Sequence, residues 1–102
     1  MLTHTVFFWL KKDLAPAQRA GFEAALRGLV SIPGAKRALV GRPGKTAARP
    51  VVDHSYDFAL EIEFASLADH DRYQDHALHT AFLEGQRSKW ERVVVYDFEH
   101  QP

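Results

Sequence analysis

The chain has 102 residues, of which 46% are hydrophobic, with 13 basic residues, 13 acidic residues and no cysteine. This length predicts one domain, residues 1–102. The balanced charge gives no electrostatic reason to expect nucleic acid or an anionic membrane as a partner, and the missing cysteines exclude disulfides and thiolate chemistry.

The first eleven residues are mostly apolar, but their pattern is that of neither a membrane anchor nor a signal peptide. The segment is too short to cross a bilayer, and it lacks the basic start and small-residue cleavage site of a signal peptide. We therefore expect a cytoplasmic protein with no membrane partner.

The first half of the chain predicts a strand, a helix and a second strand. Residues 3–11 alternate as a strand whose two faces are both largely apolar. An amphipathic helix over 16–31 begins at a proline, which suits the first helical turn, and ends at the turn Ile32-Pro33-Gly34. A weaker strand over 35–42 follows, and then a loop over 43–54.

The second half of the chain predicts a clear strand, a helical region broken in two, and a last strand. Residues 55–64 alternate cleanly between apolar and polar side chains. Ser66 is placed to cap a helix that runs to about Asp75, and a further helix is predicted over 76–90. Residues 93–99 form the last strand. The order β-α-β-β-α-β predicts an α+β fold, a four-stranded antiparallel sheet with helices on one face.

Such a sheet leaves its other face bare. On the first strand the bare face carries either Phe7 and Trp9 or Val6 and Phe8. An exposed apolar patch of that size usually marks an interface. Two such sheets packed face to face across a two-fold axis would cover it, so we expect a homodimer.

The segment from Tyr73 to His79 carries the side chains best suited to proton transfer near neutral pH. His79 shares a helix face with Phe82, so it points toward the sheet. It is either a base supported by Tyr73 or a partly buried histidine whose ring nitrogens are satisfied. His4 on the first strand is either a second wall of a pocket or a polar core residue.

The remaining polar residues are expected to have structural roles or to be solvated. His76 lies between two helices and is expected to cap or hinge them. His76 and His79 could in principle share a metal ion with Asp75, but no further ligand and no known metal-binding motif accompany them. We therefore predict no metal site and no cofactor. Asp97 on the last strand is expected to be structural. Three histidines are expected to be solvated: His54, His70 and His100.

Several short motifs resemble those of the stress-responsive dimeric A/B barrel (Dabb) family, over residues 2–99. They are His4-x-Val6-x-Phe8, Ile32-Pro33-Gly34, the strand from Tyr56 to Phe64, Tyr73-x-x-His76-x-x-His79-x-x-Phe82, and Val95-Tyr96-Asp97-Phe98. The resemblance implies a ferredoxin-like fold and a homodimer whose two sheets close into an α/β barrel with the helices outside.

One member of that family is a plant polyketide cyclase that closes a linear ketide by aldol condensation without a cofactor. The resemblance places its catalytic Tyr–His pair on Tyr73 and His79, and its first-strand histidine on His4. Two polar pocket residues of the cyclase fall on Leu26 and Phe58. The resemblance therefore implies a more apolar site in this chain.

Two functions from different classes remain open. The first is a homodimer that binds a small hydrophobic or aromatic molecule, with cofactor-free proton abstraction next to a carbonyl by His79 while Tyr73 donates a hydrogen bond. Cofactor-free oxidation of an aromatic is a variant of it. The pocket lining is predicted to be His4, Val6, Phe8, Leu26, Phe58, Leu60, Tyr73, His79, Phe82 and Trp90.

The second function is a non-enzymatic, stress-associated dimer whose cleft is filled by its own side chains, Leu26 and Phe58 among them. An open cavity that touches His79 would favour the first function, and a closed cleft would favour the second.

Overall fold

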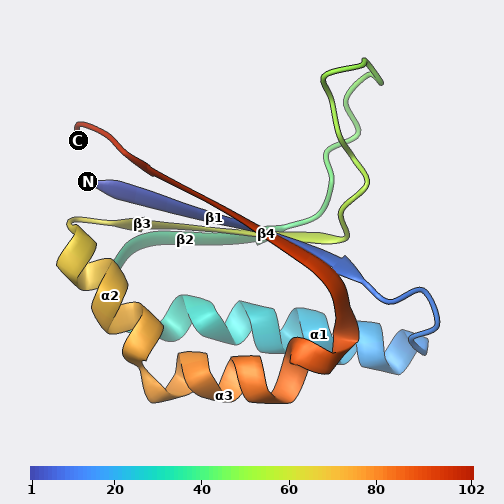
Figure 1. Cartoon of the computed structure of the whole chain (residues 1–102), viewed down its shortest axis with the longest axis horizontal. Coiled ribbons are helices and arrows are strands. Elements are labelled where there is room, and N and C mark those ends of the chain that lie inside the picture. Colours follow the sequence, from blue (N-terminus) through green and yellow to red (C-terminus); the bar gives the residue numbers. More distant parts are fainter.

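Four strands form one antiparallel sheet in the order β2-β3-β1-β4 (Figure 1). The computed structural model describes residues 1–102. The strands are β1 (Leu2–Leu10), β2 (Ala35–Gly41), β3 (Phe58–Phe64) and β4 (Trp90–Glu99). The first and third strands along the chain are therefore the two central strands, as in a ferredoxin-like fold.

Three helices lie together on one face of this sheet (Figure 1). They are α1 (Pro16–Gly28), α2 (Leu67–Asp75) and α3 (Ala77–Gln86). Short 3₁₀ turns, Leu29–Ser31 and Arg87–Lys89, follow α1 and α3 and account for the ends of the two longer helices predicted from the sequence. None of the helices is both long and apolar enough to cross a membrane.

β1 and β2 differ from their predicted bounds by at most one residue at each end, whereas β3 and β4 differ by three residues at their start. β3 begins at Phe58, later than predicted. Just before it, the Leu10 main-chain N–H donates to the Asp57 carboxylate (2.7 Å) and not to a main-chain carbonyl, and the Arg19 guanidinium donates to the same carboxylate (2.6 Å). β4 begins earlier than predicted, at Trp90, because this residue pairs with Leu10 at the end of β1.

The hydrophobic core lies between the sheet and the helices. Alternate residues of β3 are buried, which matches the predicted alternation. Phe22 and Leu26 of α1 are completely buried against this face. Aromatic rings make up much of the core: the Phe22 ring lies 5.2 Å from that of Phe8 and 5.8 Å from that of Phe58, measured between centroids.

The opposite face of the sheet has no helix over it. It carries Phe7 and Trp9 of β1, and on β4 the residue paired with Phe7 is Val94. Farther along β4, Tyr96 is 64% exposed and Phe98 is 53% exposed. The segment between β2 and β3, residues 42–57, projects away from the helices on this side (Figure 1). We call the uncovered apolar surface of Phe7, Trp9, Val94, Tyr96 and Phe98 the open face.

Replacing Leu26 by alanine should test its place in the core. The substitution Leu26→Ala removes buried methyl groups and should lower the free energy of unfolding by about 2–5 kcal/mol, measured by urea denaturation. Val30 lies nearby but is 43% exposed. Val30→Ala should therefore change the unfolding free energy by no more than about 0.5 kcal/mol. Equal effects of the two substitutions would contradict this core.

Candidate functional site

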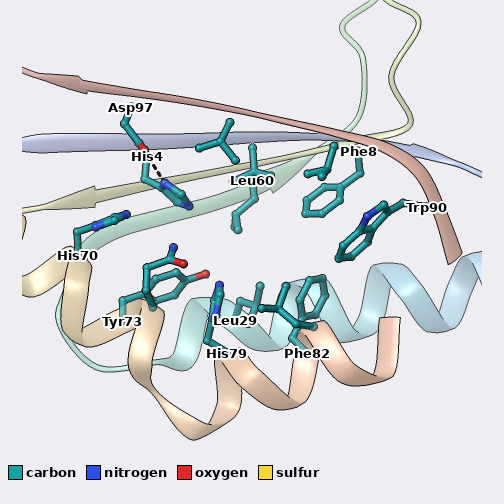
Figure 2. A pocket seen from close by; sticks show the side chains of 15 residues that line it. His4, Phe8, Leu29, Leu60, His70, Tyr73, His79, Phe82, Trp90 and Asp97 are labelled. Carbon is teal, nitrogen blue, oxygen red and sulfur yellow. Dashed lines mark hydrogen bonds and ion pairs between the residues drawn. The ribbon is translucent and has the colours of Figure 1, made fainter. Parts of the chain in front are cut away.

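A cavity of about 360 Å³ lies between the covered face of the sheet and helices α2 and α3 (Figure 2). Ten of its 15 lining residues are hydrophobic, so the walls are mainly apolar. The polar side chains gather toward one end of the cavity, and the rings of Phe8, Phe82 and Trp90 lie toward the other (Figure 2). An apolar cavity with a few grouped polar atoms is the usual form of a small-molecule site.

The break between α2 and α3 brings Tyr73 and His79 to the same cavity. On one continuous helix, residues six positions apart would lie about 120° apart around the axis. At His76 the backbone is extended (φ −66°, ψ 141°), and its Nδ1 accepts a hydrogen bond from the Leu78 N–H (3.1 Å). His76 therefore caps α3, as predicted, and the change of direction lets both functional side chains face the sheet.

Tyr73 and His79 are both buried, with 1% and 9% of their surfaces exposed. Their ring centroids lie 5.0 Å apart in an edge-on arrangement, and both side chains point into the cavity (Figure 2). The Tyr73 hydroxyl and the His79 Nδ1 have no hydrogen-bond partner within the protein. Since buried polar atoms are almost always paired, two unpaired atoms in side chains that line one cavity point to a ligand-binding role for it.

The two groups are held in definite protonation states by their surroundings. Burial lowers the pKa of His79, and the nearby His4 acts in the same direction, so the imidazole is neutral at pH 7 and able to accept a proton. Burial raises the pKa of the Tyr73 phenol, so this hydroxyl stays protonated and can donate. A neutral base and a neutral acid therefore stand side by side.

His4 projects from β1 into the same end of the cavity and is 5% exposed. Its Nδ1 donates a hydrogen bond to Oδ1 of Asp97 at 2.5 Å. Asp97 is the residue of the neighbouring strand β4 that is paired with His4. Burial lowers the pKa of His4, and the hydrogen bond to Asp97 opposes that shift. Asp97 thus orients the His4 ring within the cavity wall.

His70 lies at the cavity, although the sequence reasoning predicted a solvated side chain. Its ring centroid is 5.1 Å from that of His4, and only 16% of its side chain is exposed. The prediction was wrong: His70 precedes Tyr73 by three positions on α2, so the two side chains share the inward face of that helix. This i, i+3 spacing could have predicted from the sequence that His70 points inward. The role of Asp97 was missed as well, because it depends on the register between β1 and β4.

The predicted lining is found in part. Five of its apolar members surround the cavity: Val6, Phe8, Leu60, Phe82 and Trp90. Leu26 and Phe58 do not line the cavity; the prediction was wrong for both, since they pack with Phe22 in the core beside α1. The structure adds Leu29, Leu83, Val93 and Val95 to the lining, along with Gln74.

Comparison with known families identifies the fold family. Residues 2–100 match the model of the stress responsive A/B barrel domain, Dabb. The chain is a member of the Dabb family. This match covers nearly all of the chain, so the resemblance of the short motifs is confirmed.

Known relatives agree with this assignment. Olivetolic acid cyclase from Cannabis sativa is 25% identical over 95 residues, covering 93% of this Dabb protein and 92% of the cyclase. A Dabb family protein of Mesorhizobium loti with a ferredoxin-like fold is 28% identical, with a TM-score of 0.78 over 99% of this chain and 97% of its own. A dimeric ferredoxin-like protein of unknown function from Thermobifida fusca is 26% identical, with a TM-score of 0.76 over 95% and 88% of the two chains.

The lowered pKa of His79 has a consequence for the stability of this Dabb protein. In the unfolded chain the imidazole has its ordinary pKa of 6.5, and in the folded chain the pKa is lower. Below about pH 6.5 the unfolded state therefore binds more protons, and the folded state should lose stability as the pH falls. Above that pH the effect should vanish.

This dependence can be measured by urea unfolding at several pH values between 5 and 8. The variant His79→Gln should show a shallower loss of unfolding free energy below pH 6.5 than the unaltered protein. The remaining slope should include the contribution of His4. His54 is partly exposed in the loop before β3 and does not line the cavity, so His54→Gln is the matched control and should not show this shallower loss. An unchanged slope in His79→Gln would contradict the assigned environment of His79.

Proposed function

We propose that this Dabb protein binds a small hydrophobic or aromatic carbonyl compound in the cavity and acts on it by acid/base chemistry that needs no cofactor. The observation that carries the proposal is the open cavity with two buried, unpartnered polar atoms, the Tyr73 hydroxyl and the His79 Nδ1. Leaving such atoms unpaired costs about 1–3 kcal/mol each, and a bound carbonyl compound would recover that free energy.

The chemistry assigns a role to each side chain. His79, neutral and buried, would take a proton from the carbon next to a carbonyl group. The negative charge would then develop on the carbonyl oxygen, and Tyr73 would stabilise it by donating a hydrogen bond. The carbanion equivalent would attack a second carbonyl of the same molecule, forming a C–C bond, and His79 would return the proton to the new alkoxide. His4 would form the polar wall beside them.

The similarity to olivetolic acid cyclase supports a ring-closing reaction of this kind. The cavity walls also suit the transformation, since a flexible chain must be folded and shielded from water before it closes. The apolar rings of Phe8, Phe82 and Trp90 at the far end would hold the hydrophobic part of the compound.

The alternative function is a stress-associated dimer without enzyme activity, in which side chains fill the cleft. It would require Leu26 and Phe58 to occupy the space beside His79. Both residues lie in the core beside α1 instead, and the cavity remains open. This arrangement favours binding or catalysis over a purely structural role.

We further propose that the protein is a homodimer formed through the open face. On this face Tyr96 and Phe98 are exposed in the single chain and Phe7, Trp9 and Val94 are partly exposed, so covering them would recover hydrophobic free energy. The similar Thermobifida fusca protein is dimeric, which supports a dimer for this chain. Two open faces packed together would leave both helix layers facing solvent, with each cavity on the side of its sheet away from the interface.

The catalytic proposal is tested with purified protein and a series of linear polyketide thioesters and small aromatic carbonyl compounds. Binding is followed by calorimetry, and product formation by chromatography with mass detection. His79→Gln should reduce turnover by about a hundredfold or more, because it removes the base but keeps most of the side-chain volume. Tyr73→Phe should also reduce turnover, since it removes only the hydroxyl.

The matched control is His54→Gln, which makes the same replacement at a partly exposed histidine outside the cavity and should keep full activity. Unchanged turnover in His79→Gln would contradict the assigned base. Failure of every compound to bind would contradict the cavity as a ligand site and favour the structural dimer.

The dimer proposal is tested by light scattering after size-exclusion chromatography. The unaltered protein should have twice the mass of the single chain. Tyr96→Asp places a charge on the open face and should shift the protein to monomers. Leu78 on α3 is 51% exposed in the helix layer, so Leu78→Asp makes the same kind of change elsewhere and should leave the dimer intact. A monomeric unaltered protein would contradict the proposed interface.

A further inference from the structure

We propose that His4, His70 and Asp97 form a binding site for one divalent transition-metal ion of the zinc class at the polar end of the cavity. The three residues come from three different elements, β1, α2 and β4, which the fold brings together (Figure 2). Each offers one ligand atom, and these atoms lie within 4.8 Å of one another. This site does not depend on the proposed acid/base function.

The distances suit an ion with short bonds to nitrogen and oxygen. Ligand atoms around a tetrahedral zinc ion lie ~3.4 Å apart, because each bond is ~2.1 Å long. His4 Nδ1 and Asp97 Oδ1 are now 2.5 Å apart, and they would separate as the ion replaces the Nδ1 proton, which is released to water, while His70 would approach them. Asp97 and His70 have 40% and 16% of their side chains exposed, so both have room to rotate.

A second observation comes from the other side of the His70 ring. Its Nδ1 donates a hydrogen bond to the Asp71 carboxylate at 3.0 Å. A histidine that binds a metal ion usually donates its other ring N–H to a carboxylate in this way, because the contact selects the tautomer and orients the ring. The remaining nitrogen of His70, Nε2, is left unprotonated and available on the side of the ring that extends toward His4 (Figure 2).

The ligand set determines the kind of ion. Two imidazoles and one carboxylate suit zinc, iron or cobalt, whereas magnesium and calcium prefer oxygen ligands alone. Three protein ligands also leave a coordination position free for water or for a ligand oxygen. That position would face the cavity, where the unpartnered hydroxyl of Tyr73 lies across from His4, with ring centroids 6.1 Å apart.

The proposed site uses other residues than the metal site that was considered and rejected in the sequence analysis. Spacing along the chain drew attention to His76 and His79, but His76 is occupied as the cap of α3. The three residues of the proposed site are far apart in the sequence. Only the register between β1 and β4 and the inward face of α2 bring them together.

The experiment is a calorimetric titration of the tag-free protein with zinc chloride, without any organic ligand. We expect saturable binding of one ion per chain, and visible absorption typical of nitrogen- and oxygen-bound cobalt when cobalt(II) replaces zinc. Magnesium should not bind. His70→Ala should weaken zinc binding by about tenfold or more, and Asp97→Asn, which keeps the shape of the side chain, should also weaken it.

Surface histidines also bind zinc weakly, so a control variant is essential. His54 is a partly exposed histidine of the projecting segment, and its Nε2 is hydrogen-bonded to the Thr46 hydroxyl at 2.8 Å. His54→Gln should leave the affinity unchanged. Absence of saturable zinc binding would overturn the proposal, and so would an equal affinity in His70→Ala when circular dichroism shows that the variant is folded. Because no organic compound is present, this result is separate from success or failure of the acid/base proposal.

Discussion

β1 lies between β3 and β4 and carries large side chains on both of its faces, so it must be covered twice. On one face, Val6 and Phe8 are buried by the helices. On the other, Phe7 and Trp9 have no helix over them and are only partly buried, with the ring of Tyr56 from the loop before β3 as their neighbour. The helix layer satisfies the first requirement, and the open face remains as the basis for the proposed dimer.

The same strand places His4 among apolar neighbours on the helix side. A buried imidazole requires a partner, and Asp97 supplies it from the adjacent strand. Tyr73 and His79 have no such partner, and their surroundings keep both of them neutral. The polar end of the cavity is therefore a place where the protein retains unpaired hydrogen-bonding groups, which is costly for folding and useful for binding.

The two proposals place two different chemistries in this small volume. The proposed proton transfer uses Tyr73 and His79 from the helices. The proposed metal site uses His4, His70 and Asp97, which lie together at the edge near β4. The two sets remain separable by experiment, since one responds to organic ligands and the other to zinc. Zinc at the second set would lie close enough to influence a compound held by the first.

Much of the fold followed from local patterns in the sequence. The alternation in β3, the apolar stripe of α1 and the broken helix around His76 were all predicted, because each depends on neighbours within a few residues. The two-sided apolar pattern of β1 also predicted that the sheet has a bare face. The bounds were less certain where a tertiary contact decided them, as for the pairing of Trp90 with Leu10.

The sequence by itself determined which residues are able to do chemistry, with Tyr73, His79 and His4 foremost, and that one face of the sheet is apolar and uncovered. Tertiary structure alone decided that Leu26 and Phe58 fill the core beside α1 and leave a cavity next to His79. It also brought Asp97 and His70 to His4. The physical reason is that packing and strand register join residues that are distant in the chain, whereas periodicity reports only the face on which each residue lies.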